Sequence, residues 1–227
     1  MNNNDQTIHF TKRTPYKVEG FLKLGFCLLS FITVFATKVS FIGSIIGLSA
    51  CVMGIYRQIG RVQFNKQYLA NFMKNDFGLT LFYIFLLFSI RGIKVVFCFP
   101  VVLFFMIGVS EMILRSEVSI FSGQWFQSKA QVMVSYKDDI KRGRCLVELV
   151  LFFYSIFLLF WGRMGFLFVV MLFNYLRIKG MANPIANSTF NETRYNLVDK
   201  LNRFSLPGKT ILIKIVEFFF KLLINAQ

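Results

Sequence analysis

A nearly unbroken apolar run, Leu146 to Leu176, most constrains what this chain can fold into. As one helix, its 31 residues would measure about 46 Å, at about 1.5 Å per residue, whereas the hydrocarbon core of a bilayer is about 30 Å thick. The firm interruption, Gly162-Arg163, divides the run into arms of 16 and 13 residues. The run therefore predicts a membrane hairpin with its turn at Arg163, and not one straight span.

The composition extends this membrane assignment to the whole chain. The 227 residues have a mean hydropathy of +0.58, 56% are apolar and 30 are phenylalanine, which is more apolar surface than a soluble core of this size can hide. The apolar runs do not alternate with polar residues as barrel strands do, so helices must satisfy the backbone in lipid. We therefore predict an all-α, polytopic helical membrane protein.

Two further pairs of apolar runs have the same form. One pair breaks at Thr37-Lys38 and the other at Arg91 to Lys94, and Pro100 is expected to kink an arm of the latter. The first run is expected to remain as an anchor, because no cleavage-site pattern follows it. The predicted organisation is a polar tail (1–20), hairpin 1 (21–56), an amphipathic linker (57–76), hairpin 2 (77–110), a basic connection with surface helices (111–145), hairpin 3 (146–176) and a C-terminal region with amphipathic helices (177–227).

The distribution of lysine and arginine chooses between two topologies. If each pair of runs were one long span, the two sides would carry 9 and 12 of these residues, which is no asymmetry. If each pair is a hairpin, 21 of the 26 lie in the polar segments on one side and four lie in the turns. The positive-inside rule favours hairpins with both termini in the cytosol. Each arm is about 22 Å long against about 27 Å of hydrocarbon in the endoplasmic reticulum, so full spans and insertion into the cytosolic leaflet both stay open.

Small residues recur in the second arm of hairpin 1. Gly43, Gly47, Ala50 and Gly54 follow a three-to-four spacing, which lets helices approach closely in lipid. The pattern predicts packing within the hairpin, and a homodimer face is the alternative.

Residues 209–225 form the clearest amphipathic pattern in the chain. Polar residues recur every three or four positions and the rest are Ile, Leu, Val and Phe. Such a narrow polar stripe is typical of a helix that lies in the membrane surface or docks against the hairpins, and a full span would place three charges at its centre. The residues expected to bind the membrane are Lys209, Ile211, Leu212, Lys214, Ile215, Phe218, Phe219, Phe220, Lys221 and Leu222.

The preceding segment carries turn and capping signals. Asn183-Pro184 predicts a turn, and Thr189 with Glu192 fits a capping box for the helix that follows. Two glycosylation sequons begin at Asn187 and Asn191. Glycans are added only in the lumen, so this topology predicts that both asparagines stay unmodified.

No pattern in the sequence predicts catalysis, a metal site or a cofactor. The single histidine, His9, lies in the polar tail, so histidine-based acid–base chemistry and zinc binding are not expected. The charged residues within the arms, Lys23 and Glu148, lie near arm ends, and the intramembrane ionisable path of a transporter is missing. The four cysteines lack a C-x-x-C pair and are predicted to be small core hydrophobes: Cys27, Cys51, Cys98 and Cys145.

The formal net charge of +15 predicts anionic lipid headgroups as the partner of this surface, and nucleic acid is not expected.

The stretch LFNYLRIKGMANPIANSTFNETR, at the end of hairpin 3, resembles the signature region of the transmembrane protein 33 family, which includes fungal nuclear pore-membrane relatives. Upstream, RVQFNKQYLANFMKNDFGLTLFYIFLLFS and FPVVLFFMIGVS are similar to its middle region, so the resemblance covers roughly residues 57 to 205. The residues that carry the motif are Leu176, Arg177, Asn183, Pro184, Phe190, Asn191, Glu192 and Arg194.

The resemblance implies a non-enzymatic protein of the endoplasmic reticulum and nuclear envelope. Relatives are linked to tubule and sheet shape through reticulon-type partners, to nuclear pore distribution and to C-terminal amphipathic helices that bind membrane. The leading hypothesis is therefore a membrane-shaping or scaffolding protein, with homo-oligomers possible. A channel or transporter subunit and an enzyme on lipid substrates are the alternatives.

Overall fold

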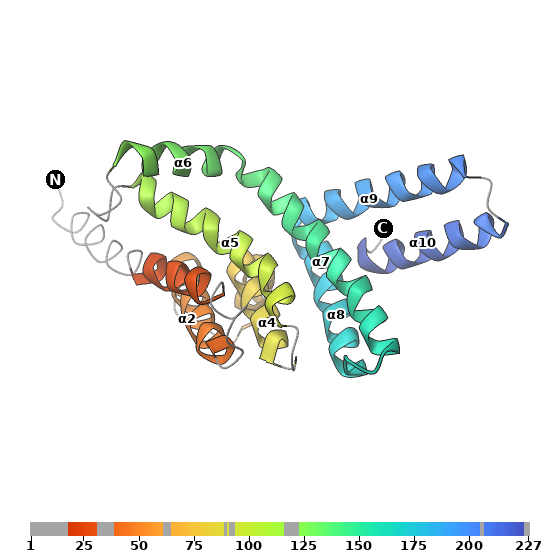
Figure 1. Cartoon of the computed structure of the whole chain (residues 1–227), viewed down its shortest axis with the longest axis horizontal. Helices are drawn as coiled ribbons and strands as arrows, with labels where there is room; N and C mark the ends of the chain where they lie inside the picture. The colour runs from red at the N-terminus through yellow and green to blue at the C-terminus, as the bar shows by residue number, and fades with distance from the viewer. Residues whose placement is uncertain are drawn as a thin grey trace. The chain divides into compact units, whose positions relative to one another are not determined.

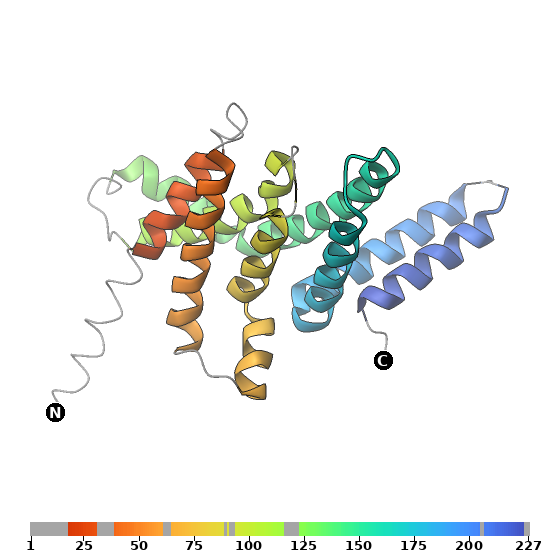
Figure 2. The same cartoon turned by 90° about the horizontal axis from the view of Figure 1, so that it is seen from below.

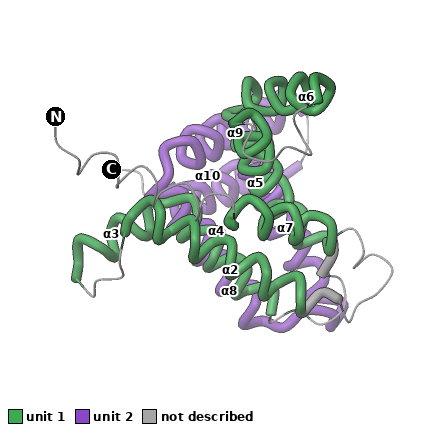
Figure 3. Tube along the Cα trace, turned by 90° about the vertical axis from the view of Figure 1, so that its left-hand side faces the viewer, with its two compact units in different colours: residues 1–141 green, residues 142–227 purple. Residues whose placement is uncertain are grey.

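The structure, a computed structural model, describes residues 18–30, 39–60, 65–88, 90, 94–115, 123–204 and 207–224. This part of the chain is all-helical, and it contains three helices long and apolar enough to cross a membrane. The predicted fold class is confirmed. The chain divides into two compact units, residues 1–141 and 142–227, with the boundary inside one helix (Figure 3).

The first unit contains the predicted hairpins 1 and 2. A helix over residues 18–30 precedes α2 (Val39–Ile59), and α3 (Lys66–Lys74) leads into α4 (Asp76–Phe88) and α5 (Lys94–Leu114). Pro100 lies inside α5, and α6 (Gln124–Ser135) follows. The predicted breaks at Thr37-Lys38 and Arg91 fall on residues outside the described part of the chain.

The small residues of α2 face other helices of the same chain. A Cβ added to Gly47 would lie 2.7 Å from the Phe26 ring, and one added to Gly54 would meet the Phe77 ring. Ala50 is fully buried between these positions. Gly47 therefore packs within hairpin 1, as predicted, whereas Gly54 packs against α4 of hairpin 2, so the small residues also bring the two hairpins of unit 1 together.

The second unit contains hairpin 3 and the C-terminal helices. Helix α7 (Lys137–Phe160) and helix α8 (Phe166–Ala182) run antiparallel on either side of a tight turn (Figures 1 and 2). Gly162 adopts a φ of 65° in this turn, a left-handed conformation that glycine takes at little cost. The chain reverses at Gly162-Arg163, as predicted. Helices α9 (Pro184–Arg203) and α10 (Lys209–Ile224) then form an antiparallel pair in both views.

Two local expectations differ from the structure. Thr189 does not cap a helix: its hydroxyl donates to the Ile185 carbonyl in the middle of α9. The cap is Asn183, whose side-chain oxygen accepts from the Ile185 and Ala186 amides, with Pro184 at the first helical position. Both residues suit these positions, because asparagine is a strong N-cap and proline needs no N–H there.

The basic connection also differs from a pair of surface helices. Helix α6 is separate, but residues 137–145 form the first turns of α7 and continue directly into the apolar arm.

Candidate functional site

The two ends of hairpin 1 are joined by a buried ionic cluster. Glu19, at the start of helix 18–30, lies 3.1 Å from the guanidinium of Arg57 at the end of α2. The same carboxylate pairs at 2.5 Å with Lys23, one helical turn further along. Glu19 and Lys23 are both buried. Glu19 is at the start of the first helix and Arg57 is near the end of the second. Their contact therefore holds the two ends of hairpin 1 side by side.

The ends of hairpin 2 are joined through the first turn of α7. Asp76 at the start of α4 pairs with Lys141 at 2.9 Å, and Glu111 near the end of α5 pairs with Lys137 at 2.5 Å. Lys137 and Lys141 are four residues apart on one helix, so their side chains are neighbours about 6 Å apart. The carboxylates of Asp76 and Glu111 are therefore held close together, so hairpin 2 also begins and ends on the same side of unit 1.

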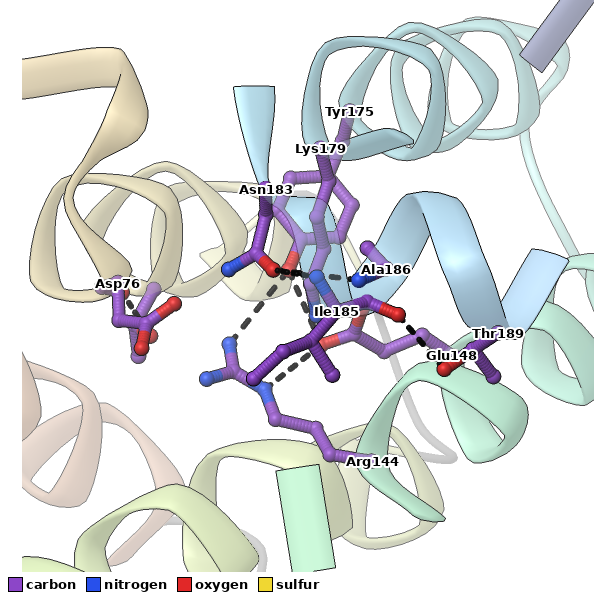
Figure 4. Close-up of polar contacts among 10 residues, drawn as sticks. Asp76, Arg144, Glu148, Tyr175, Lys179, Asn183, Ile185, Ala186 and Thr189 are labelled. Carbon is purple, nitrogen blue, oxygen red and sulfur yellow. Dashed lines mark hydrogen bonds and ion pairs between the residues drawn. The ribbon is translucent and has the colours of Figure 1, made fainter. Parts of the chain in front are cut away.

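Hairpin 3 has the most deeply buried cluster (Figure 4). Glu148 of α7 is fully buried and pairs with Arg144 on its own helix at 2.9 Å and with Lys179 near the end of α8 at 2.5 Å. The Tyr175 hydroxyl donates to the same carboxylate at 3.0 Å. Two cations and one hydroxyl thus compensate a single buried carboxylate, as burial of a charge requires.

These clusters share one arrangement in hairpins 1 and 3. A carboxylate in the first helix, at or just before the start of the apolar arm, contacts a cation one turn away on its own helix and a second cation near the end of the returning helix. Sequence reasoning placed Lys23 and Glu148 near arm ends but missed their partners. The four-residue spacing of Arg144 and Glu148 was a visible signal; the pairing with Lys179 depends on the closed hairpin.

The motif residues of the C-terminal region occupy different environments. Leu176 and Phe190 are fully buried, whereas Arg177 is exposed at the end of α8. Asn183 and Pro184 begin α9. The remaining members are only partly buried or exposed: Asn191, Glu192 and Arg194. The structure brings Phe190 against Gly180 and uses Asn183 as a cap, while Glu192 lies on another face of α9.

Helix α10 has an exposed apolar face and a buried one. Its exposed apolar residues are spaced by three or four positions and include Ile211, Ile215, Phe218 and Leu222, with Leu212 beside them. The buried side, formed by Phe220, Leu223 and Ile224, lies in the C-terminal half of the helix.

Phe219 anchors α10 to hairpin 3. Its ring lies within 5.2–6.0 Å, centroid to centroid, of the rings of Phe152, Phe153 and Phe173 on α7 and α8. The residues predicted to bind the membrane therefore divide between two surfaces: Phe219 and Phe220 pack inside unit 2, and Phe218 faces outward.

Other site chemistry is sparse in the part of the chain that the structure describes. No group of three or more His, Cys, Asp or Glu side chains there could hold a metal ion. The four cysteines lie in the described ranges, are buried and form no disulfide, which agrees with their prediction as core residues.

The comparisons with known proteins agree with the resemblance found in the sequence. No curated protein and no solved structure matches the chain. A family model described as Transmembrane protein 33/Nucleoporin POM33 matches residues 18–224, from the first described helix to the end of α10. Membership implies a membrane protein of the endoplasmic reticulum or nuclear pore membrane, and the membrane-length helices agree with it. This chain therefore belongs to the Transmembrane protein 33/Nucleoporin POM33 family.

Proposed function

We propose that this protein shapes or scaffolds the membrane of the endoplasmic reticulum and nuclear envelope, without catalysing a reaction. The observation that carries the proposal is the pairing of hairpin ends, between Glu19 and Arg57 and between Glu148 and Lys179. An apolar helix pair whose two ends are joined enters and leaves the bilayer on one side. The excess of lysine and arginine in the polar segments supports the cytosol as that side.

The dimensions of hairpin 3 support a role in curvature. Helix α7 as a whole is long enough to cross a membrane, but its arm beyond the buried Glu148 cluster, from Glu148 to Phe160, extends for only about 18–20 Å at about 1.5 Å per residue, against about 27 Å of hydrocarbon in the reticulum membrane. A short hairpin with a broad polar base occupies more area in the leaflet it enters than in the opposite leaflet, or it thins the bilayer around it. Either effect favours a curved membrane.

The exposed face of α10 would add area to the same leaflet. Ile211, Ile215 and Phe218 form an apolar stripe, and Lys214 and Lys221 are exposed on the same helix. A helix of this kind buries its apolar face between lipid headgroups and binds more strongly when those headgroups are anionic.

The resemblance of the sequence to this family implies reticulon-type and nuclear pore proteins as partners of the scaffold. Further copies of this chain are a separate expectation, which the small-residue spacing of α2 first raised.

The test reconstitutes the full chain into liposomes that contain anionic lipid and measures vesicle diameter by electron microscopy. We expect narrower vesicles or tubules with the native chain, and a return toward control diameters with Ile211→Asp/Phe218→Asp. Lys129→Ala on α6 is the matched surface control. Unchanged diameters with the native chain would contradict the proposal. Ion flux through the same vesicles above that of empty liposomes would favour a channel subunit.

A further inference from the structure

A groove lined by both apolar and charged side chains lies between α7 and α9 in unit 2. Its volume is about 350 Å³. Helix α7 contributes Arg142 and Leu146, one turn apart, and α9 contributes a single face that includes Glu192, Asn196, Leu197 and Lys200. The groove is separate from the Glu148 cluster, whose side chains are buried inside the unit.

The groove combines apolar side chains, which can contact the upper part of the acyl chains of a lipid, with charged side chains, which can contact its headgroup. Leu146, at the start of the apolar run of hairpin 3, and Leu197 are partly exposed in it. Arg142 lies one helical turn further from the membrane-embedded arm. The groove is thus at the boundary where hydrocarbon gives way to headgroups when hairpin 3 is inserted.

The charged side chains of the groove are available for a ligand. Arg142, Lys200 and Glu192 make no ion pair with any residue in the described ranges. The hydroxyls of the two threonines in the lining, Thr189 and Thr193, donate to carbonyls of α9 itself. Recognition of a charged ligand therefore depends on two cations and one carboxylate.

We infer that this groove binds an anionic glycerophospholipid whose headgroup carries an ammonium and a carboxylate beside the phosphate, as phosphatidylserine does. The phosphate and the carboxylate of this headgroup form ion pairs with Arg142 and Lys200, and its ammonium forms one with Glu192. A headgroup with a phosphate alone satisfies the cations but leaves Glu192 facing a negative ligand, which is unfavourable. The site deepens the proposed membrane function and rests on it only for the insertion of hairpin 3.

The test uses the full chain purified in detergent and native mass spectrometry with phosphatidylserine, phosphatidylglycerol or phosphatidylcholine at equal concentration. We expect phosphatidylserine adducts to exceed those of the other two lipids. Arg142→Ala/Lys200→Ala should lower them at least about tenfold, because charge-assisted hydrogen bonds to an anion are lost. Lys66→Ala/Lys129→Ala removes the same charge from exposed positions on α3 and α6 and should leave the adducts unchanged.

Glu192→Gln tests the ammonium contact separately. This change should bring phosphatidylserine binding to the level of phosphatidylglycerol, without weakening the latter. Equal binding of the two anionic lipids by the native chain, an unchanged preference in Glu192→Gln, or an equal loss in the lysine control would each overturn the inference. Lipid adducts in detergent do not depend on membrane curvature, so failure here leaves the shaping experiment to be judged on its own result.

Discussion

Lys179 Nζ lies 2.5 Å from Glu148 Oε2, although the two residues are 31 positions apart in the chain. Both side chains are buried, with exposed fractions of 3% and 0%. The pair joins the start of the apolar part of α7 to the end of α8 (Figure 4). Hairpin 3 is therefore closed at its base by a charged contact, whereas the arms beyond it are held by apolar side chains.

Removing one partner of this contact should be strongly destabilising. We expect Glu148→Gln to lower the free energy of unfolding by about 3–5 kcal/mol, because it leaves two buried cations with a neutral partner. Unfolding of the full chain in mixed micelles, followed by circular dichroism, measures the change. Asp199→Asn is the control, since Asp199 forms an exposed ion pair with Arg203 and should change stability by less than about 1 kcal/mol. Equal effects of the two substitutions would contradict the role assigned to Glu148.

The packing of α8 against α9 and α10 depends on Gly180. An added Cβ would lie 2.5 Å from the carbonyl oxygen of Leu223 and 3.2 Å from the Phe190 ring. Gly180→Ala should therefore destabilise the unit by about 1–3 kcal/mol. Gly143, in the helical first part of α7, has nothing within 4 Å of an added Cβ.

Gly143→Ala is accordingly the matched control in the same unfolding assay. It should be neutral or stabilise the protein by up to about 1 kcal/mol, because alanine is more favourable than glycine in the interior of a helix. A loss of stability in both alanine variants would show that helix packing at Gly180 is not the cause.

The hairpin turn was predictable and the start of α9 was not. Gly162-Arg163 interrupts a run too long for one span, so local sequence and membrane thickness together indicate the turn. For α9, two local signals competed, Asn183-Pro184 and the Thr189–Glu192 capping box. The helix extends back to Pro184, where Asn183 caps it and Ala186 and Phe190 become buried against the rest of unit 2. That outcome depends on tertiary contacts that periodicity does not report.

The pattern of α10 predicted an amphipathic helix but not which apolar residues are free. Phe218, Phe219 and Phe220 are adjacent in the sequence and point in directions about 100° apart on a helix. Only contact with α7 and α8 decides that Phe219 joins an aromatic cluster while Phe218 stays outside. Likewise, Glu148 and Lys179 became a pair only when the hairpin closed.

Phe218 and Phe220 provide a matched test of the two faces of α10. Phe220 is 1% exposed and Phe218 is 65% exposed. We expect Phe220→Ala to cost about 3–5 kcal/mol in the free energy of unfolding, whereas Phe218→Ala should stay within about 0.5 kcal/mol. Binding of the purified chain to added liposomes should show the reverse order, with the larger loss for Phe218→Ala. The same order in both measurements would contradict the assignment of the two faces.

The two sequons should remain unglycosylated in cells. Asn187 donates its side-chain amide to the Gly180 carbonyl, and Asn191 donates to the side-chain oxygen of Asn187. These amides are engaged within unit 2, and the charge distribution favours a cytosolic position. Treatment with a glycan-removing enzyme should leave the electrophoretic mobility of the protein unchanged, with a luminal glycoprotein from the same cells as control. A mobility shift that Asn187→Gln or Asn191→Gln abolishes would reverse the predicted orientation.

The position of Arg163 tests how deeply hairpin 3 enters the bilayer. Arg163 is exposed at the turn beside two exposed aromatic residues, Phe160 and Trp161. An arginine at the centre of the hydrocarbon costs about 2.5–3.5 kcal/mol on insertion scales, and tryptophan favours the headgroup level, so the turn should reach the luminal interface.

The native cysteines are buried, which allows an impermeant maleimide to report on a newly introduced cysteine. Arg163→Cys should react only after the microsomes are opened, whereas Asn202→Cys, exposed in α9, should react in sealed microsomes. Labelling of Arg163→Cys in sealed microsomes would contradict the hairpin topology, and no labelling under either condition would place the turn within the hydrocarbon.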